Sequence, residues 1–231
     1  MKKLSIVILI LGFAVSMASA QERFVCISGG YTIPYGDFAT SDAKNLNSGY
    51  ALNGYNVGFD ISYFISDYFG FGTNLRFSSC KPDVDFFNQL LNEKFGSQMD
   101  TINYSATDYN LHNFLLGPVI KADIGDYFAI YGKVFIGVMS TYKPIQTLEY
   151  KPIGEELISK ETVGDYTGSF GYNFGVGVIV KFTSKIGLNI SADYIAGKPI
   201  FEKYNLETLE IIEVKQPISF YNLNAGIILS L

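Results

Sequence analysis

The sequence is poor in the residues from which most catalytic and metal sites are built. It has no tryptophan, one histidine and two cysteines among 231 residues. A single histidine excludes a metal site made from several imidazoles, and it leaves His112 as the one imidazole available for acid-base chemistry. The sequence therefore predicts no metal and no cofactor, and it does not favour an enzyme.

Long apolar runs and positive charge are also scarce. After residue 20, no stretch reaches the ~18 apolar residues of a membrane helix, so the chain can cross a bilayer only as a closed barrel. Without Lys2 and Lys3, 15 basic residues stand against 22 acidic ones, a net charge of −7. This balance offers no basic patch and argues against nucleic acid as a partner.

The first 20 residues have the features of a secretory signal peptide. Lys2 and Lys3 precede an apolar run from Leu4 to Val15, and Ala18-Ser19-Ala20 forms a small-x-small cleavage site. We expect cleavage between Ala20 and Gln21, because the run is too short for the ~20 apolar residues of a membrane anchor. Residues 21–231 are then expected to form one domain.

The rest of the chain is rich in segments whose side chains alternate between apolar and small or polar. The last, from Pro217 to Leu231, places Tyr221, Leu223, Ile227, Leu229 and Leu231 on one face and Asn222, Asn224 and Gly226 on the other. Alternation with a period of two predicts a β-strand with two different faces. Eight such segments are expected: 23–34, 51–65, 69–78, 109–122, 128–142, 169–182, 187–194 and 217–231.

The connections between these segments alternate in length. Those after the second, fourth and sixth segments have three or four residues, and the others are much longer. Short periplasmic turns and long outer loops are typical of an up-and-down antiparallel barrel that spans the outer membrane. A soluble lipocalin-like barrel is the main rival, but the chain lacks tryptophan and hence the Gly-x-Trp signature of lipocalins.

Charged residues fall on the face that is expected to point inward. A Lys or Arg on the lipid face costs ~2–4 kcal/mol at the membrane midplane, and we expect that face to carry none within the segments. Asp60 is expected beside Asn74 and diagonal to Arg76, with Lys133 and Asp193 in the same layer. Lys121 and Lys181 are expected at the bottom, where water reaches them. The predicted interior network comprises Asp60, Arg76, Lys121, Lys133, Lys181 and Asp193.

The motif Gly-Gly-Tyr-Thr-Ile-Pro-Tyr-Gly-Asp-Phe at 29–38 resembles the first strand and loop of the OmpX-like, OmpA-barrel-like and PorT-like small outer-membrane barrels. The alternating C-terminal segment resembles their terminal assembly strand, although it ends in Leu231 where the family usually has an aromatic residue. The resemblance implies an all-β, eight-stranded transmembrane barrel in the bacterial outer membrane. It also implies contact with outer-membrane lipid and recognition by the barrel assembly machinery.

The resemblance implies mostly scaffold, adhesion, secretion-accessory or defence roles. We therefore expect a monomer that acts through its outer loops as a binding, adhesion or assembly-accessory protein, with an extracellular or secretion-complex protein as a candidate partner. Two alternatives stay open. One is a narrow solute channel. The other is a lipid-modifying enzyme at the outer rim around His112, with Ser105 and Asp108 nearby, although a plain rim residue is the preferred interpretation of His112.

The long loops contain three further signals. Residues 85–96 have the apolar pattern of a short capped helix, beginning at Asp85, that lids the barrel, lies on the membrane or binds a partner. Thr101, in Asp100-Thr101-Ile102, resembles an O-glycosylation site, and the acidic third and fourth loops predict hairpins beyond the membrane.

Cys26 and Cys80 are expected at opposite ends of the barrel, too far apart for a disulfide.

Overall fold

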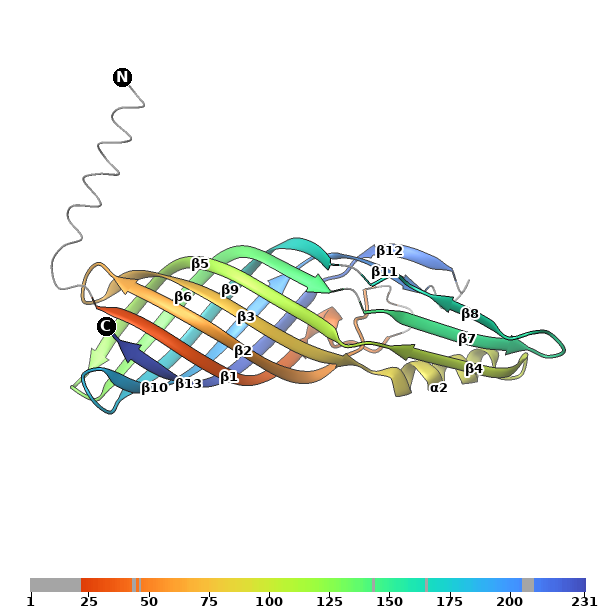
Figure 1. Ribbon diagram of the computed structural model, residues 1–231, viewed down its shortest axis with the longest axis horizontal. Helices are drawn as coiled ribbons and strands as arrows, with labels where there is room; N and C mark the ends of the chain where they lie inside the picture. The colour runs from red at the N-terminus through yellow and green to blue at the C-terminus, as the bar shows by residue number, and fades with distance from the viewer. Residues whose placement is uncertain (1–21, 43–44, 46, 143, 165, 205–209) are drawn as a thin grey trace, which may run out of the picture.

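The computed structural model describes residues 22–231 except 43–44, 46, 143, 165 and 205–209, so the predicted signal peptide and its predicted cleavage site between Ala20 and Gln21 lie outside the described residues. Eight antiparallel strands close into a barrel in the order β1-β13-β10-β9-β6-β5-β3-β2 (Figure 1). The strands are β1 (Arg23–Tyr35), β2 (Ala51–Phe64), β3 (Phe69–Pro82), β5 (Tyr109–Ile124), β6 (Phe128–Tyr142), β9 (Tyr166–Lys181), β10 (Ile186–Gly197) and β13 (Ile218–Ser230). The predicted fold class is confirmed.

The first and last strands close the barrel. β1 pairs with β13 from Phe24 opposite Ser230 to Tyr35 opposite Ser219. Three short turns, at 65–68, 125–127 and 182–185, lie at the end of the barrel where the last strand finishes (Figure 1). Because every strand has two neighbours, the barrel has no open edge.

The outer wall of the barrel is apolar. Its exposed side chains include Ile27, Phe59, Phe71, Phe114, Leu116, Ile136, Phe174, Val176, Ile190 and Leu223. The largest exposed apolar patch of a typical soluble monomer covers only ~300–600 Å², so a wall of this kind requires lipid. The expectation of a charge-free face is wrong at a strand end, where Arg23 is exposed and its guanidinium lies 5.5 Å from the ring centre of Tyr63.

The barrel interior is layered, which the sequence pattern did not predict. Polar side chains fill the middle, and buried apolar side chains lie on both sides of them. Toward the short turns lie Phe24, Phe64, Ile179 and Ile228; toward the long loops lie Leu111, Leu115, Met139, Ile195 and Phe220. The inward face of a strand in a narrow barrel accepts either kind of residue, so alternation alone does not reveal these layers.

The long loops build a second structure beyond the barrel. It contains α2 (Val84–Phe95), the three-stranded sheet of β4 (Met99–Ala106), β7 (Gln146–Pro152) and β8 (Ile158–Glu161), and the hairpin of β11 (Ile200–Tyr204) and β12 (Ile211–Lys215), while the short helix η2 (Gly36–Phe38) of the first loop contacts β13. Figure 1 shows these elements at the end opposite to the C-terminus. The expected hairpins in the third and fourth loops are therefore present. None of the helices in the described residues has the length and hydropathy to cross a membrane.

The predicted loop helix is present with a different N-cap. The Asp83 side chain, and not that of Asp85, accepts a hydrogen bond from the backbone N–H of Phe86 at 3.1 Å. Asp85 lies inside the first turn, where its charge faces the positive end of the helix dipole. The helix packs on β4 of the loop sheet and not over the barrel mouth.

Candidate functional site

An ionic network crosses the middle of the barrel. The carboxylate of Asp60 accepts hydrogen bonds from Arg76 at 2.9 Å and from Lys133 at 3.0 Å. Lys133 also forms an ion pair with Asp193 at 2.9 Å. Lys133 is on β6 and Asp193 is on β10, so this pair extends the network across the lumen from β2 and β3. Asn74 donates to Asp60 at 2.9 Å, as its position opposite Asp60 in the register predicts.

Asn224 closes these contacts into a ring. Its side chain donates to Asp193 at 2.8 Å and accepts from Arg76 at 2.8 Å. Five side chains, those of Arg76, Asp60, Lys133, Asp193 and Asn224, thus form a continuous circuit of two cations, two anions and one amide, which we call the central ring. Sequence reasoning listed Asn224 as inward-facing but did not assign it to the network.

The central ring is largely buried. Arg76 is 0% exposed, and it also donates to Asn56 at 2.6 Å and to Ser28 at 3.0 Å. A buried guanidinium is tolerated only where partners satisfy its donors, since charge is costly in a low-dielectric interior. The ring has no net charge, and its side chains bond to one another across the lumen.

A second ionic cluster lies near the short turns. Lys121 pairs with Glu22 and, at 3.2 Å, with Asp123; Lys181 pairs with Asp123 at 2.6 Å. Sequence reasoning missed both carboxylates. Asp123 was recognisable, because it lies two residues from Lys121 and so shares its face. Glu22 precedes the first strand and gives no such signal.

The expectation that water reaches both lysines holds only for Lys181. Its side chain is a quarter exposed, whereas Lys121 is 5% exposed. The rings of Phe24 and Phe64 cover the Lys121 ammonium, with ring centres 5.3 and 5.1 Å away. The inward aromatic layer therefore replaces water around this cation, in a cation–π arrangement.

The first loop closes the outer mouth of the barrel. Phe38 is 0% exposed and packs edge-on against Tyr109, with ring centres 5.1 Å apart. The Tyr109 hydroxyl donates to the Gly49 carbonyl at 2.8 Å. A Cβ on Gly49 would lie 2.3 Å from the Phe38 carbonyl oxygen, so only glycine permits this approach. The mouth is covered by Phe38 rather than by the loop helix.

The outer loops form a module with a core of its own. Phe87 of α2 stacks on Tyr104 of β4 with ring centres 4.0 Å apart, over buried Leu91, Ile102 and Leu148. The Asn88 side chain donates to the Tyr104 carbonyl at 2.9 Å and accepts from its N–H at 2.6 Å. We call α2 with β4, β7 and β8 the outer module. At its far end, Ile153 and Leu157 are 65% and 60% exposed beside Glu155 and Glu156.

The remaining candidate residues are not brought together. His112 faces outward from β5 between the rings of Phe77, at 5.1 Å, and Tyr166, at 5.7 Å. Asp108 instead accepts from Ser79 at 3.5 Å, and within the described ranges no hydrogen bond links His112 to Asp108 or Ser105. The geometry thus gives no triad. Likewise, no group of three or more potential metal ligands occurs among the residues that the structure describes.

The two cysteines, Thr101 and the C-terminal segment lie apart from the two ionic clusters. Cys26 and Cys80 are buried free thiols. Thr101 is exposed on β4. The C-terminal segment forms β13 with Tyr221, Leu223, Ile227 and Leu229 facing outward, and Leu231 follows the strand with its backbone N–H bound to the Arg23 carbonyl at 2.9 Å.

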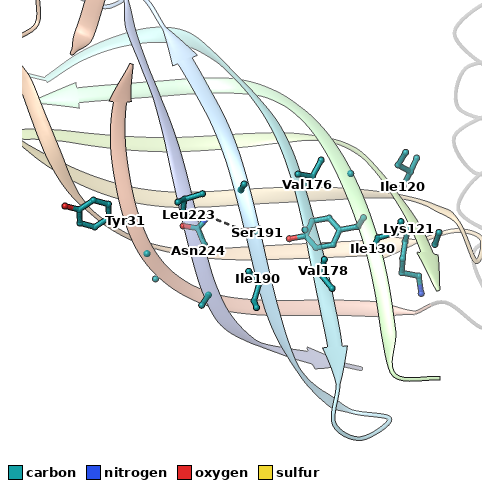
Figure 2. Close-up of a pocket in the computed structure, with 18 of the residues that line it drawn as sticks. Tyr31, Ile120, Lys121, Ile130, Val176, Val178, Ile190, Ser191, Leu223 and Asn224 are labelled. Carbon is teal, nitrogen blue, oxygen red and sulfur yellow. Dashed lines mark hydrogen bonds between the residues drawn. The ribbon is translucent and has the colours of Figure 1, made fainter. Parts of the chain in front are cut away.

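A shallow groove of about 1140 Å³ runs across the outer wall from β1 to β5. It exists because small residues, Gly29, Ala225, Ala192, Gly132 and Ala122, lie between larger apolar ones. Figure 2 shows Ile190, Val176 and Val178 along this wall, with Ser191 bonded to Asn224 behind it. The groove belongs to the lipid-facing surface.

Comparison with known proteins gives one family match and several similar solved structures. The model of the outer membrane protein beta-barrel domain family matches residues 5–213. No curated protein matches the sequence. Similar solved structures include Neisserial surface protein A (9% identity, TM-score 0.46, 90% of this chain and 97% of that chain) and OprG of Pseudomonas aeruginosa (10%, 0.46, 92% and 98%). Another is Ail, the attachment invasion locus protein of Yersinia pestis (15%, 0.39, 90% and 97%).

A family model that spans most of the chain, together with a closed eight-stranded barrel and an apolar outer wall, places the protein in the bacterial outer membrane. The chain belongs to the outer membrane protein beta-barrel domain family.

Proposed function

We propose that this outer-membrane protein acts by binding a protein partner through its outer module, on a barrel whose interior is a structural plug. The observation that carries the proposal is the outer module itself. Loops that only connect strands need no core, whereas α2 and the loop sheet bury Phe87, Leu91 and Leu148 in one. A folded module outside the membrane presents a fixed surface to a partner.

Charge favours a partner with a basic surface. The outer segments 36–50, 83–108, 143–165 and 198–217 contain 16 acidic and 8 basic residues, a net charge of −8. The rest of residues 21–231 contains 6 acidic and 7 basic residues. Because nearly all the net charge lies outside the membrane, electrostatic attraction steers a cationic surface toward the module.

The proposal also covers the processing and assembly of the chain, its oligomeric state and its lack of catalytic activity. Residues 1–20 serve as a signal peptide cleaved before Gln21, residues 21–231 form the barrel domain, and the assembly machinery recognises β13 through its outward residues. The protein works as a monomer without a cofactor and is not an enzyme. The channel alternative is less well supported, because the central ring and Phe38 obstruct the lumen at two levels.

The test compares cross-linked partners from outer membranes. Glu155→Lys with Glu156→Lys reverses charge at the exposed tip of the module without touching its core. Asp67→Lys with Asp126→Lys makes the same change in exposed periplasmic turns and is the matched control. We expect the tip variant to lose the cross-linked partner and the control to retain it. Equal recovery from both variants would contradict binding through the module tip.

A further inference from the structure

A second groove lies high on the outer wall, near the long-loop end of β9, β10 and β13. Its volume is about 400 Å³, within the range of ~300–1,000 Å³ that is usual for small-molecule sites. The floor consists of Ala196 and Ser219, which are paired across β10 and β13. Two pairs further down the same strands, and so on the same face, are Tyr194 and Tyr221, so the hollow arises from two small side chains above a row of tyrosines.

The walls of this groove are aromatic, and its floor is hydroxylated. Phe170, Tyr172 and Tyr194 line it, and the Ser219 hydroxyl at its floor donates to the Tyr35 carbonyl at 2.9 Å. Tyr221 lies between Tyr194 and Tyr35, with ring centres 5.2 and 5.4 Å apart, respectively. Such rows of aromatic residues mark the membrane–water interface of outer-membrane barrels. The groove therefore opens at the depth where lipid headgroups meet acyl chains.

A single cation borders the groove on its outer side. Lys198 lines it, is exposed and makes no ion pair with the residues that the structure describes. Its charge lies at the aqueous edge, above the aromatic walls. A ligand that satisfies both features must combine an apolar chain with an anionic head.

We propose that this groove binds one phosphate-bearing glycolipid of the lipid A type from the outer leaflet. An acyl chain lies over Ala196 between Tyr172 and Tyr194, and a headgroup phosphate contacts the Lys198 ammonium. A strongly hydrated ammonium acts as a point-charge binder of phosphate and needs no bidentate geometry. The groove continues the lipid-facing wall, so the site does not depend on the function proposed for the outer module.

The experiment titrates full-length protein in detergent micelles with purified lipid A and counts bound lipids by native mass spectrometry. Lys198→Ala is expected to weaken binding about five-fold, since one lysine near an anionic lipid surface contributes ~1 kcal/mol. Lys215→Ala, which removes an exposed lysine from β12 of the same hairpin but outside the groove, should leave binding unchanged. Lipid A without its phosphates and phosphatidylglycerol should both bind more weakly than lipid A.

A second pair of variants tests the groove itself. Ala196→Phe fills the floor and should abolish the bound lipid, whereas Ala192→Phe, four residues down the same strand, should not. Heat-dependent mobility on gels checks that every variant is folded. The proposal is overturned if Lys198→Ala and Lys215→Ala weaken binding equally, or if Ala196→Phe keeps its lipid. It is also overturned if phosphatidylglycerol or dephosphorylated lipid A binds as well as lipid A.

Discussion

At the scale of single residues, Arg76 connects most of the polar side chains at the centre of the barrel. It is fully buried and donates to Asn56, Ser28, Asp60 and Asn224. Removing the guanidinium leaves Asp60 with only one charged partner in a low-dielectric interior, which is more costly than losing the pair as a whole. The ring therefore stabilises the barrel only as a complete set.

Arg76→Ala should lower the free energy of unfolding by about 3–5 kcal/mol, the usual cost of breaking a buried ion pair from one side. Urea titration of protein refolded in lipid vesicles measures this. The control is Arg23→Ala, which removes an exposed arginine over Tyr63, a contact of about 0.5–1 kcal/mol. If both variants lose the same small amount of stability, the ring does not hold the barrel.

The two cysteines provide a residue-scale test of the strand register. Cys26 lies opposite Asp60 and Ile228, whereas Cys80 lies opposite Gly54 and Tyr109 near the outer mouth. Both thiols should react with an alkylating reagent only after unfolding, and intact mass should show two added groups per chain. A peptide containing Cys26 linked to Cys80 would mean that the register is wrong.

At the scale of secondary-structure elements, α2 depends on its N-cap. The Asp83 carboxylate satisfies a backbone N–H that the helix cannot satisfy itself, and losing such a cap costs roughly 0.5–2 kcal/mol. Asp83→Ala should therefore raise amide hydrogen exchange in α2 by about five-fold, taking ~1 kcal/mol for the cap. Asp85→Ala removes only an interaction with the helix dipole and should have a smaller effect. A larger effect of Asp85→Ala would mean that Asp85, where the sequence predicted the start of the helix, is the N-cap.

The elements also show where sequence reasoning succeeds and where it stops. Strands β2, β3 and β13 follow from strict alternation, because each faces lipid on one side and small or polar residues on the other. The module sheet of β4, β7 and β8 did not follow, since its strands come from two different loops and pair over a long sequence separation. The alternation at Ile102 and Tyr104 is too short to reveal such a partner.

The interior network of the barrel was likewise only partly predictable from the sequence. Registers counted from the short turns placed Asp60 opposite Asn74, but counting could not place Asn224, which reaches the ring from β13 on the other side of β1. Phe38 was visible within the motif at 29–38, yet nothing in the local sequence shows that the loop bends inward over Tyr109. Contacts across the lumen depend on closure, which is a property of all eight strands together.

At the scale of the whole molecule, closure should make the barrel resist detergent. With no strand edge, every strand must separate from two neighbours at once. The protein should migrate differently in SDS gels before and after boiling. The same mobility in both lanes would count against a closed barrel.

The side chains of the barrel close its lumen, and we propose that the protein works through its outer surface. Recording from purified protein in planar bilayers tests this closure most directly, because eight strands leave an interior just wide enough for side chains. We expect no stable conductance for the natural protein and transient openings only when Arg76→Ala breaks the central ring. Stable conductance of the natural protein that Arg76→Ala leaves unchanged would contradict a closed lumen.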